Sequence, residues 1–206
     1  KQFMMLGNEP ILARSINRIH EALPAAEIVV VLPEEHIALW RNIAARFEVA
    51  RHKIASGGAE RFFSVKNGLK AVGYDVELVA VQDGVRPLAA EAMIRRAVEE
   101  AATYGTAIPV VEAVDSYRVV EGEESKIIDR RPLRIVQTPQ VFHADLYRAA
   151  MAQIPADEDL TDDNQLMERI GYPVKPVDIG KNNIKITHPD DIARAEWVVA
   201  AREAGK

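Results

Sequence analysis

Hydrophobic residues follow two different spacings along the chain, and each spacing predicts a different element. Apolar residues that recur every three to four positions predict helices, whereas short continuous runs of branched aliphatic residues predict strands that are buried on both faces. The predicted helices span 10–23, 34–47, 60–72, 89–104, 144–154, 162–170 and 189–203. The predicted strands span 28–32, 49–55, 76–81, 106–111, 174–179 and 184–187.

This alternation of strands and helices predicts an α/β fold in which helices cover both faces of a predominantly parallel sheet. The preference for right-handed crossovers leaves few possible topologies for such a sheet. Ligands of these folds bind at the carboxyl ends of the strands. Asp83 comes directly after the predicted strand at 76–81, so we expect it at that edge.

The pattern changes over residues 114–136, which are polar and rich in turns. Residues 116–120 and 126–128 are expected to pair as a hairpin around Gly122. An isolated hairpin is marginally stable in water because it has little core of its own. We therefore expect this segment to be an arm that packs on a partner subunit, with a loose surface insertion as the alternative. The whole of 1–206 is otherwise expected to form a single domain.

The composition excludes several classes of function. The 206 residues carry a formal net charge of −5, and this acidic balance argues against a general nucleic-acid binder. The chain has no cysteine, which excludes disulfides and thiolate nucleophiles. It also has no apolar run of about 18 residues, so the sequence predicts no transmembrane helix. We expect neither nucleic acid nor membrane as a partner.

The most informative motif is Gln82-Asp83-Gly84-Val85-Arg86, at the end of a predicted buried strand. Mg²⁺ prefers carboxylate oxygens together with substrate phosphates. Arginine binds phosphate through two parallel hydrogen bonds. Asp83 and Arg86 therefore suit a site for a metal and a triphosphate. The simpler alternative is that Asp83 caps the turn and Arg86 is solvated.

Gly57-Gly58-Ala59 precedes the predicted helix that contains Ser64. Glycines before a helix allow a ligand to approach the backbone closely, and a helix N-terminus favours anions. An ordinary loop explains the same pair of glycines.

Three further segments carry polar residues that suit a binding site. Gln137-Thr138-Pro139-Gln140 is one of them. Thr161 precedes a predicted helix, where helix capping alone would explain it. Lys185 alternates with Ile184 and Ile186, and in a strand this spacing places the lysine on the opposite face, usually the face towards solvent.

Taken together, these motifs resemble the 2-C-methyl-D-erythritol 4-phosphate cytidylyltransferase family of the non-mevalonate isoprenoid pathway. Each motif is weak alone, but they run in family order over essentially the whole chain. The matching segments are Lys1-Gln2-Phe3, Gly57-Gly58-Ala59-Glu60-Arg61, Ser64-Val65, Asn67-Gly68-Leu69, Asp83-Gly84-Val85-Arg86-Pro87, Asp129-Arg130, Gln137-Thr138-Pro139-Gln140, Thr161-Asp162-Asp163 and Asn183-Ile184-Lys185-Ile186-Thr187.

The resemblance implies a three-layer, Rossmann-like nucleotidyltransferase fold with a β-arm at 114–136 that locks a homodimer. It implies CTP and a polyol phosphate as substrates, Mg²⁺ held by Asp83, and a cytoplasmic bacterial enzyme. Lys1 and Lys185 would flank the reacting phosphate as catalytic residues. The implied CTP contacts are Gly57, Gly58, Ala59, Ser64 and Asp83, and the implied acceptor contacts are Arg86, Ser116, Arg130, Thr138 and Thr161, some of them from the partner's arm.

The resemblance also implies the reaction. The phosphate of the acceptor attacks the α-phosphorus of CTP, and pyrophosphate leaves. Catalysis of this kind is mostly positioning and cationic stabilisation. A phosphate monoester is largely ionised at neutral pH, so no strong general base is required.

The sequence departs from the family pattern in two places that bear on function. The family has a strand and a glycine-rich, arginine-bearing loop before the position of Lys1, and we expect the natural chain to include them. Ser116 stands where the family usually has threonine, which bears on the choice of acceptor.

Two other functions stay open. A ribitol 5-phosphate cytidylyltransferase would share the fold, CTP and most motifs, because its acceptor differs by one chain carbon and a methyl branch. A nucleotide-binding module without catalysis is an alternative of another class. The presence of both Asp83 and Lys185 favours the enzyme over that module.

Overall fold

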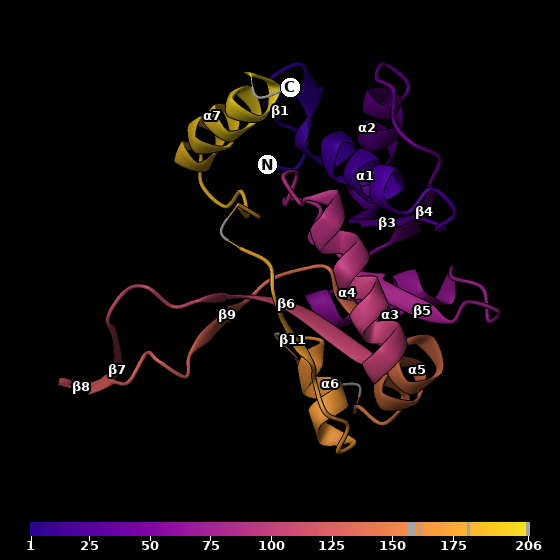
Figure 1. Ribbon diagram of the computed structural model, residues 1–206. Helices are drawn as coiled ribbons and strands as arrows, with labels where there is room; N and C mark the ends of the chain where they lie inside the picture. Colours follow the sequence, from indigo (N-terminus) through magenta and orange to yellow (C-terminus); the bar gives the residue numbers. More distant parts are fainter. Residues whose placement is uncertain (156–159, 161, 181, 205–206) are drawn as a thin grey trace.

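A mixed β-sheet lies between two layers of helices in the computed structural model, which describes residues 1–155, 160, 162–180 and 182–204 (Figure 1). The sheet has the order β11-β6-β10-β5, and β9 pairs with β6 off this path. These strands are β5 (Leu78–Val81), β6 (Thr106–Glu112), β9 (Arg134–Val136), β10 (Gln140–His143) and β11 (Pro176–Asp178). Strands β5, β6 and β11 run in one direction, because β10 is antiparallel to both β5 and β6 and β11 is parallel to β6.

One face of the sheet is covered by α4 (Glu91–Tyr104), which ends at Gly105 with a positive φ of 83°. Ala97 and Ala101 are fully buried on this helix and pack with Val141 of β10. Small residues let the helix lie close to the strands. This packing confirms the helical prediction at 89–104, which began two residues too early.

The opposite face is covered by α3 (Arg61–Lys70), α5 (Ala144–Ala152) and α6 (Asn164–Arg169). Phe142, next to Val141 on β10, is fully buried among these helices. Its ring stacks on that of Tyr147, with 4.6 Å between the centroids. Successive residues of β10 thus point into the two cores, as strand geometry requires, and the expected three-layer α/β class is confirmed.

A smaller unit comes from the first part of the chain. Strands β3 (Val29–Leu32) and β4 (Lys53–Ser56) form a parallel two-stranded sheet. Helices α1 (Ile11–Ala22) and α2 (Glu34–Ala44) pack on it around Trp40, which is fully buried.

The C-terminal helix α7 (Asp190–Ala204) returns to the N-terminal part of the chain (Figure 1). Its buried Ala195 packs with Leu6 in the same apolar cluster. Leu6 belongs to a short antiparallel pair formed by β1 (Met5–Leu6) and β2 (Glu9–Pro10). Among the described residues, no helix is both long and apolar enough to cross a membrane.

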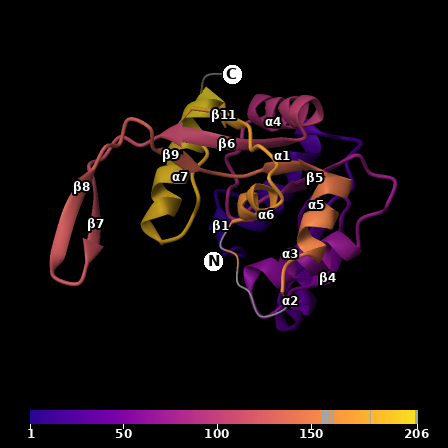
Figure 2. The ribbon, with the colours of Figure 1, turned by 90° about the horizontal axis from the view of Figure 1, so that it is seen from below.

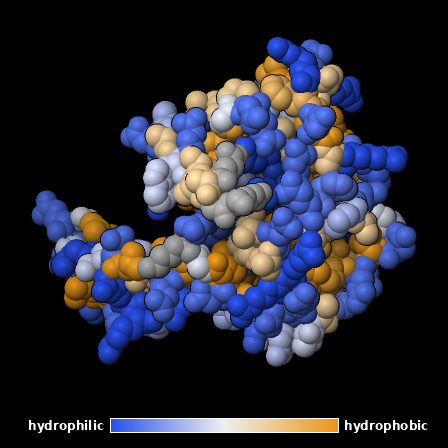
Figure 3. Space-filling model, turned by 45° about the horizontal axis from the view of Figure 1, so that its top comes forward, coloured by the Kyte–Doolittle hydropathy of each residue, from blue (hydrophilic) through white to orange (hydrophobic). Residues whose placement is uncertain are grey.

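The arm predicted within 114–136 is a hairpin of β7 (Tyr117–Glu121) and β8 (Glu124–Ile128) that projects from the body (Figures 1 and 2). Gly122 has a φ of 61°, a conformation that favours glycine in a tight turn. Val120 is 67% exposed and Ile127 is 63% exposed. Figure 3 shows hydrophobic side chains among the polar ones along this projection.

One expected strand is absent, and strand β10, between β6 and β5, was not expected. Residues 184–187 form no strand, because their backbone meets a loop instead of a sheet edge; the Ile186 N–H donates to the Val85 carbonyl at 2.9 Å. Strand β10 was not predicted, because its apolar run is only two residues long and follows a proline.

Candidate active site

Asp83 lies just beyond the carboxyl end of β5, as predicted. Its backbone N–H donates to the hydroxyl of Thr138 at 3.0 Å, and its carbonyl accepts from the Arg86 N–H at 3.1 Å. The hydroxyl of Ser15, on α1, donates to the carbonyl of Gly84 at 2.9 Å. Thr138 and Ser15 therefore hold this turn from two distant parts of the chain.

Two cations flank the Asp83 carboxylate and share one of its oxygens. Arg86 Nε lies 3.0 Å from Oδ2, and Lys185 Nζ lies 3.1 Å from the same atom. The arginine side chain is 9% exposed, so the alternative of a solvated Arg86 is wrong. Lys185 is 45% exposed at the edge of this cluster, where its ammonium can meet a ligand as well as Asp83.

The environment of Asp83 keeps its carboxyl ionised. Burial alone would raise its pKa, but the charges of Lys185 and Arg86 and their hydrogen bonds outweigh that effect and lower the pKa below 3.8. The site therefore keeps a fixed negative charge between two positive ones at neutral pH.

Thr138 and Asn183 are buried residues whose hydrogen bonds hold Asp83 and Arg86 in position. Thr138 is 4% exposed, and its hydroxyl accepts the Asp83 N–H. Asn183 donates from Nδ2 to the Thr138 carbonyl, and its own carbonyl accepts from Arg86 Nη1, each at 2.8 Å. The sequence pattern assigns no role to Asn183, because only the folded chain brings it beside Thr138 and Arg86.

The loop at Gly57-Gly58-Ala59, which the resemblance assigns to CTP and which we call the nucleotide loop, is folded onto the first turn of α3. Gly58 donates its N–H to Ser64 Oγ at 3.0 Å, and this hydroxyl donates to the Glu60 carbonyl at 3.0 Å. A Cβ on Gly58 would lie 2.3 Å from the Cβ of Phe63, so a side chain there would push the loop away. The Gly57 N–H donates to the Leu32 carbonyl at 2.7 Å, which ties the loop to β3.

Replacing Ser64 with alanine should loosen this loop. Because the family resemblance places CTP on the loop, we expect the KM for CTP to rise by about tenfold, since a lost hydrogen bond of this kind is worth roughly 1 kcal/mol or more. Steady-state kinetics with CTP as the varied substrate would measure the change. Thr103→Ala is a matched control, since the Thr103 hydroxyl also donates to the carbonyl four residues earlier on an exposed helix. An unchanged KM in Ser64→Ala would contradict a role of this hydroxyl in the site.

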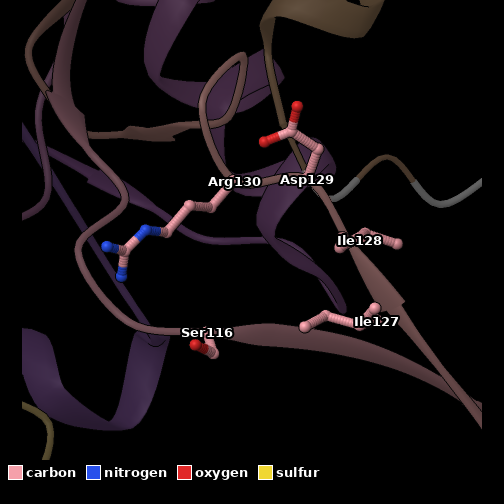
Figure 4. A pocket seen from close by; sticks show the side chains of 5 residues that line it. All are labelled: Ser116, Ile127, Ile128, Asp129 and Arg130. Atoms are coloured by element: carbon pink, nitrogen blue, oxygen red, sulfur yellow. The ribbon is translucent and has the colours of Figure 1, made fainter.

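Ser116 and Arg130 lie at the base of the arm, where they line a cavity of about 460 Å³ together with Ile127, Ile128 and Asp129 (Figure 4). The Arg130 guanidinium donates to the carbonyl of Val114. Strand β5 and the arm lie on opposite sides of the molecule in both ribbon views (Figures 1 and 2). Among the described residues, the Asp83 carboxylate pairs with Arg86 and Lys185, whereas the Arg130 side chain bonds to Val114.

Two other predicted residues, Lys1 and Ala59, form no hydrogen bond or ion pair with the Asp83 cluster in the described part of the chain. Lys1 has an exposed side chain that forms no ion pair with any residue in the described part of the chain, although its carbonyl accepts from the Met4 N–H at 3.0 Å. Thr161 lies outside the described residues. Ala59, in the glycine loop, is exposed. The roles of these three residues stay predictions.

The cluster offers one position for a divalent cation. Within the described residues, Asp83 Oδ1 forms no hydrogen bond or ion pair, because both cations bind Oδ2. The described residues contain no group of three or more His, Cys, Asp or Glu side chains suited to a metal. A single free carboxylate oxygen fits Mg²⁺, which takes one or two carboxylates and completes its coordination with phosphates and water.

The chain is similar to known proteins over nearly its whole length. The profile of the 2-C-methyl-D-erythritol 4-phosphate cytidylyltransferases matches residues 1–201. The enzyme of that name from Bacteroides fragilis is 38% identical over 194 residues, which cover 93% of this chain and 87% of that protein. The one from Geobacillus kaustophilus is 37% identical over 207 residues, which cover 99% of this chain and 90% of that protein.

Solved structures show the same relationship. The crystal structure of 2-C-methyl-D-erythritol 4-phosphate cytidylyltransferase from Thermus thermophilus superposes with a TM-score of 0.82 at 32% identity and covers 97% of this chain and 94% of that one. The chain therefore belongs to the 2-C-methyl-D-erythritol 4-phosphate cytidylyltransferase family.

Proposed function

We propose that this protein transfers the cytidylyl group of CTP to 2-C-methyl-D-erythritol 4-phosphate and releases pyrophosphate, in the biosynthesis of isoprenoid precursors. Family membership supports the reaction class. The observation that carries the proposal is the Asp83 carboxylate, held between Arg86 and Lys185 at the carboxyl edge of the sheet. Ligands of α/β folds bind at this edge.

The reaction needs little from the protein beyond placement and charge. An oxygen of the acceptor phosphate attacks the α-phosphorus of CTP, and the bond to the pyrophosphate oxygen breaks. Because negative charge spreads over the phosphoryl oxygens in the transition state, a fixed cation beside them lowers the barrier. Lys185 supplies such a cation, since its ammonium is half exposed and oriented by Asp83. Lys1 is proposed to act in the same way.

Mg²⁺ is the proposed cofactor, with Asp83 Oδ1 as its protein ligand. Bound there with the triphosphate, it would neutralise charge on the phosphates. Lys185 and Arg86 would still hold the other oxygen of the carboxylate and so fix its orientation. Gly57, Gly58, Ala59 and Ser64 are proposed to bind the nucleoside.

The arm is proposed to complete the site of a second subunit. Its exposed valine and isoleucine side chains suit burial in a symmetric homodimer. Ser116 and Arg130 would then reach the partner's acceptor subsite, together with Arg86, Thr138 and Thr161 of that partner. The bacterial origin of the relatives supports a bacterial enzyme, and we propose the cytoplasm as its compartment.

Pyrophosphate release by the full-length protein with CTP and Mg²⁺ tests the proposal. 2-C-Methyl-D-erythritol 4-phosphate and ribitol 5-phosphate would be offered in parallel reactions. We expect release with the first acceptor only. Release with ribitol 5-phosphate alone would instead assign the protein to polyol-phosphate metabolism. Binding of CTP without release in either reaction would refute the catalytic proposal.

A further inference from the structure

A second buried carboxylate lies apart from Asp83 and has no part in the reaction described above. Asp163, just before α6, has a side chain that is 2% exposed. Its Oδ1 accepts a hydrogen bond from the Tyr147 hydroxyl at 2.6 Å, and its Oδ2 accepts one from Arg61 Nη2 at 2.5 Å. Both carboxylate oxygens are thus bound, and the network joins α3, α5 and the start of α6.

The charges in this network reinforce one another. Burial disfavours the Arg61 guanidinium, but its attraction to Asp163, their hydrogen bond and the charge of Asp83 outweigh burial and raise its pKa. Burial, together with the neighbouring Asp163 charge, raises the pKa of Tyr147 well above 10.0. The tyrosine therefore stays neutral and donates its hydroxyl proton to Asp163, while Arg61 stays charged.

Arg61 is the first residue of α3, so the ion pair fixes the turn on which the nucleotide loop rests. Ser64 and Phe63 follow Arg61 within about one helical turn. The Ser64 hydroxyl accepts the Gly58 N–H, and the Phe63 side chain occupies the space that a Cβ on Gly58 would need. Phe62 holds the same turn from the apolar side, with 1% of its surface exposed. A displacement of Arg61 would therefore shift the surface against which Gly58 packs.

The other end of the network lies next to Thr161, one of the residues predicted to contact the acceptor. Asp162, beside Asp163, accepts a hydrogen bond from Gln140 Nε2 at 3.3 Å. Gln140 is two residues from Thr138, which binds the Asp83 backbone. Asp163 and its neighbour Asp162 together connect the loop at 57–58 with the part of the chain that holds Asp83.

We propose that Asp163, acting through Arg61, is a positioning residue that holds the glycine loop at 57–58 in the geometry that binds the cytidine nucleotide. This inference rests on the proposed function for the identity of the nucleotide. A buried ion pair contributes little to net stability compared with apolar residues of the same size. The Arg61–Asp163 pair instead fixes the orientation of the start of α3. Two apolar residues in its place would define that orientation less well.

A double-mutant cycle in the full-length protein tests this proposal. Asp163→Asn, Arg61→Gln and the double variant would be compared with the parent for kcat, for the KM of each substrate and for CTP affinity by isothermal titration calorimetry. We expect each single variant to raise the KM and the Kd for CTP by about tenfold, the scale of one charged hydrogen bond. The KM for the acceptor should change by less than about twofold.

The double variant decides whether Asp163 acts through Arg61. If it does, the double variant binds CTP no more weakly than the weaker single variant. Effects that multiply, or an unchanged CTP affinity in folded single variants, would overturn the proposal. Glu91→Gln is the matched control, because it breaks exposed ion pairs of Glu91 with Arg95 and Arg18 and should leave both constants unchanged.

Tyr147→Phe provides an independent measurement, because a buried carboxylate replaced by an amide can prevent folding. Tyr147→Phe removes one hydrogen bond to Asp163 but keeps the aromatic ring and the negative charge of Asp163. We expect a threefold to tenfold rise in the Kd for CTP, because the hydroxyl donates to a charged carboxylate but its loss reaches the loop only through Arg61; a folded Tyr147→Phe with parental affinity would overturn the proposal. Calorimetry needs no acceptor, so a parent that binds CTP without turnover would refute the proposed reaction and leave this test intact.

Discussion

Asp83→Asn should lower the rate of pyrophosphate release by about 10²–10³-fold, the scale for removing one electrostatic group from an active site. Asparagine keeps the shape of the side chain but removes the charge that orients Lys185 at 3.1 Å and the oxygen proposed to bind Mg²⁺. Both losses act on the transferring phosphoryl group. Single-turnover assays at saturating CTP and acceptor would measure the chemical step directly.

The loss must be separated from unfolding, because Asp83 is mostly buried beside Arg86. Thermal denaturation would show whether Asp83→Asn is folded at the assay temperature. Asp145→Asn is a suitable control, since its side chain is 95% exposed and only 3.8 Å from an arginine on the same helix. A folded Asp83→Asn with a rate near that of the parent would show that the chemistry lies elsewhere.

Mixing two inactive variants should restore activity if the arm completes the partner's site. Arg130→Ala would lower activity by about 10²-fold through loss of one charged donor to the acceptor phosphate. A heterodimer of Asp83→Asn with Arg130→Ala would hold one intact site, with Asp83 from one chain and Arg130 from the other. Random exchange of subunits should then recover about a quarter of parental activity.

The control for this experiment carries both substitutions on one chain. Mixed with Asp83→Asn, that double variant has no intact Asp83 in any site and should restore nothing. Native mass spectrometry would verify that heterodimers form. Heterodimers without recovered activity would mean that Arg130 acts within its own subunit or not at all, and the shared-site proposal would fail.

Local pattern was enough to predict most helices, because each has an apolar face of regular spacing. The local pattern failed where contacts with residues distant in sequence decide the structure. Residues 184–187 alternate like a strand, yet they meet the loop at Val85 through one backbone bond and find no sheet edge. Strand β10 has a weak local signal, and it exists because β5 and β6 leave a position between them.

The site was predictable to a similar extent. Asp83 could be placed at the edge of the sheet because a strand ends there, and the structure brings Arg86 and Lys185 to it. The burial of Asp163 could not be foreseen, because a Thr-Asp-Asp segment before a helix is typical of capping. Its partners, Arg61 and Tyr147, are distant in sequence and meet it only in the folded chain.

Strand β10 also restricts how the length of this protein can change during evolution. Val141 and Phe142 fill different cores, and Thr138 lies only three positions before Val141. One inserted residue between Thr138 and Val141 would either turn Val141 and Phe142 to the opposite faces of the sheet or move Thr138 away from Asp83. Insertions should therefore be tolerated at the tip of the arm around Gly122, and eliminated between 138 and 141.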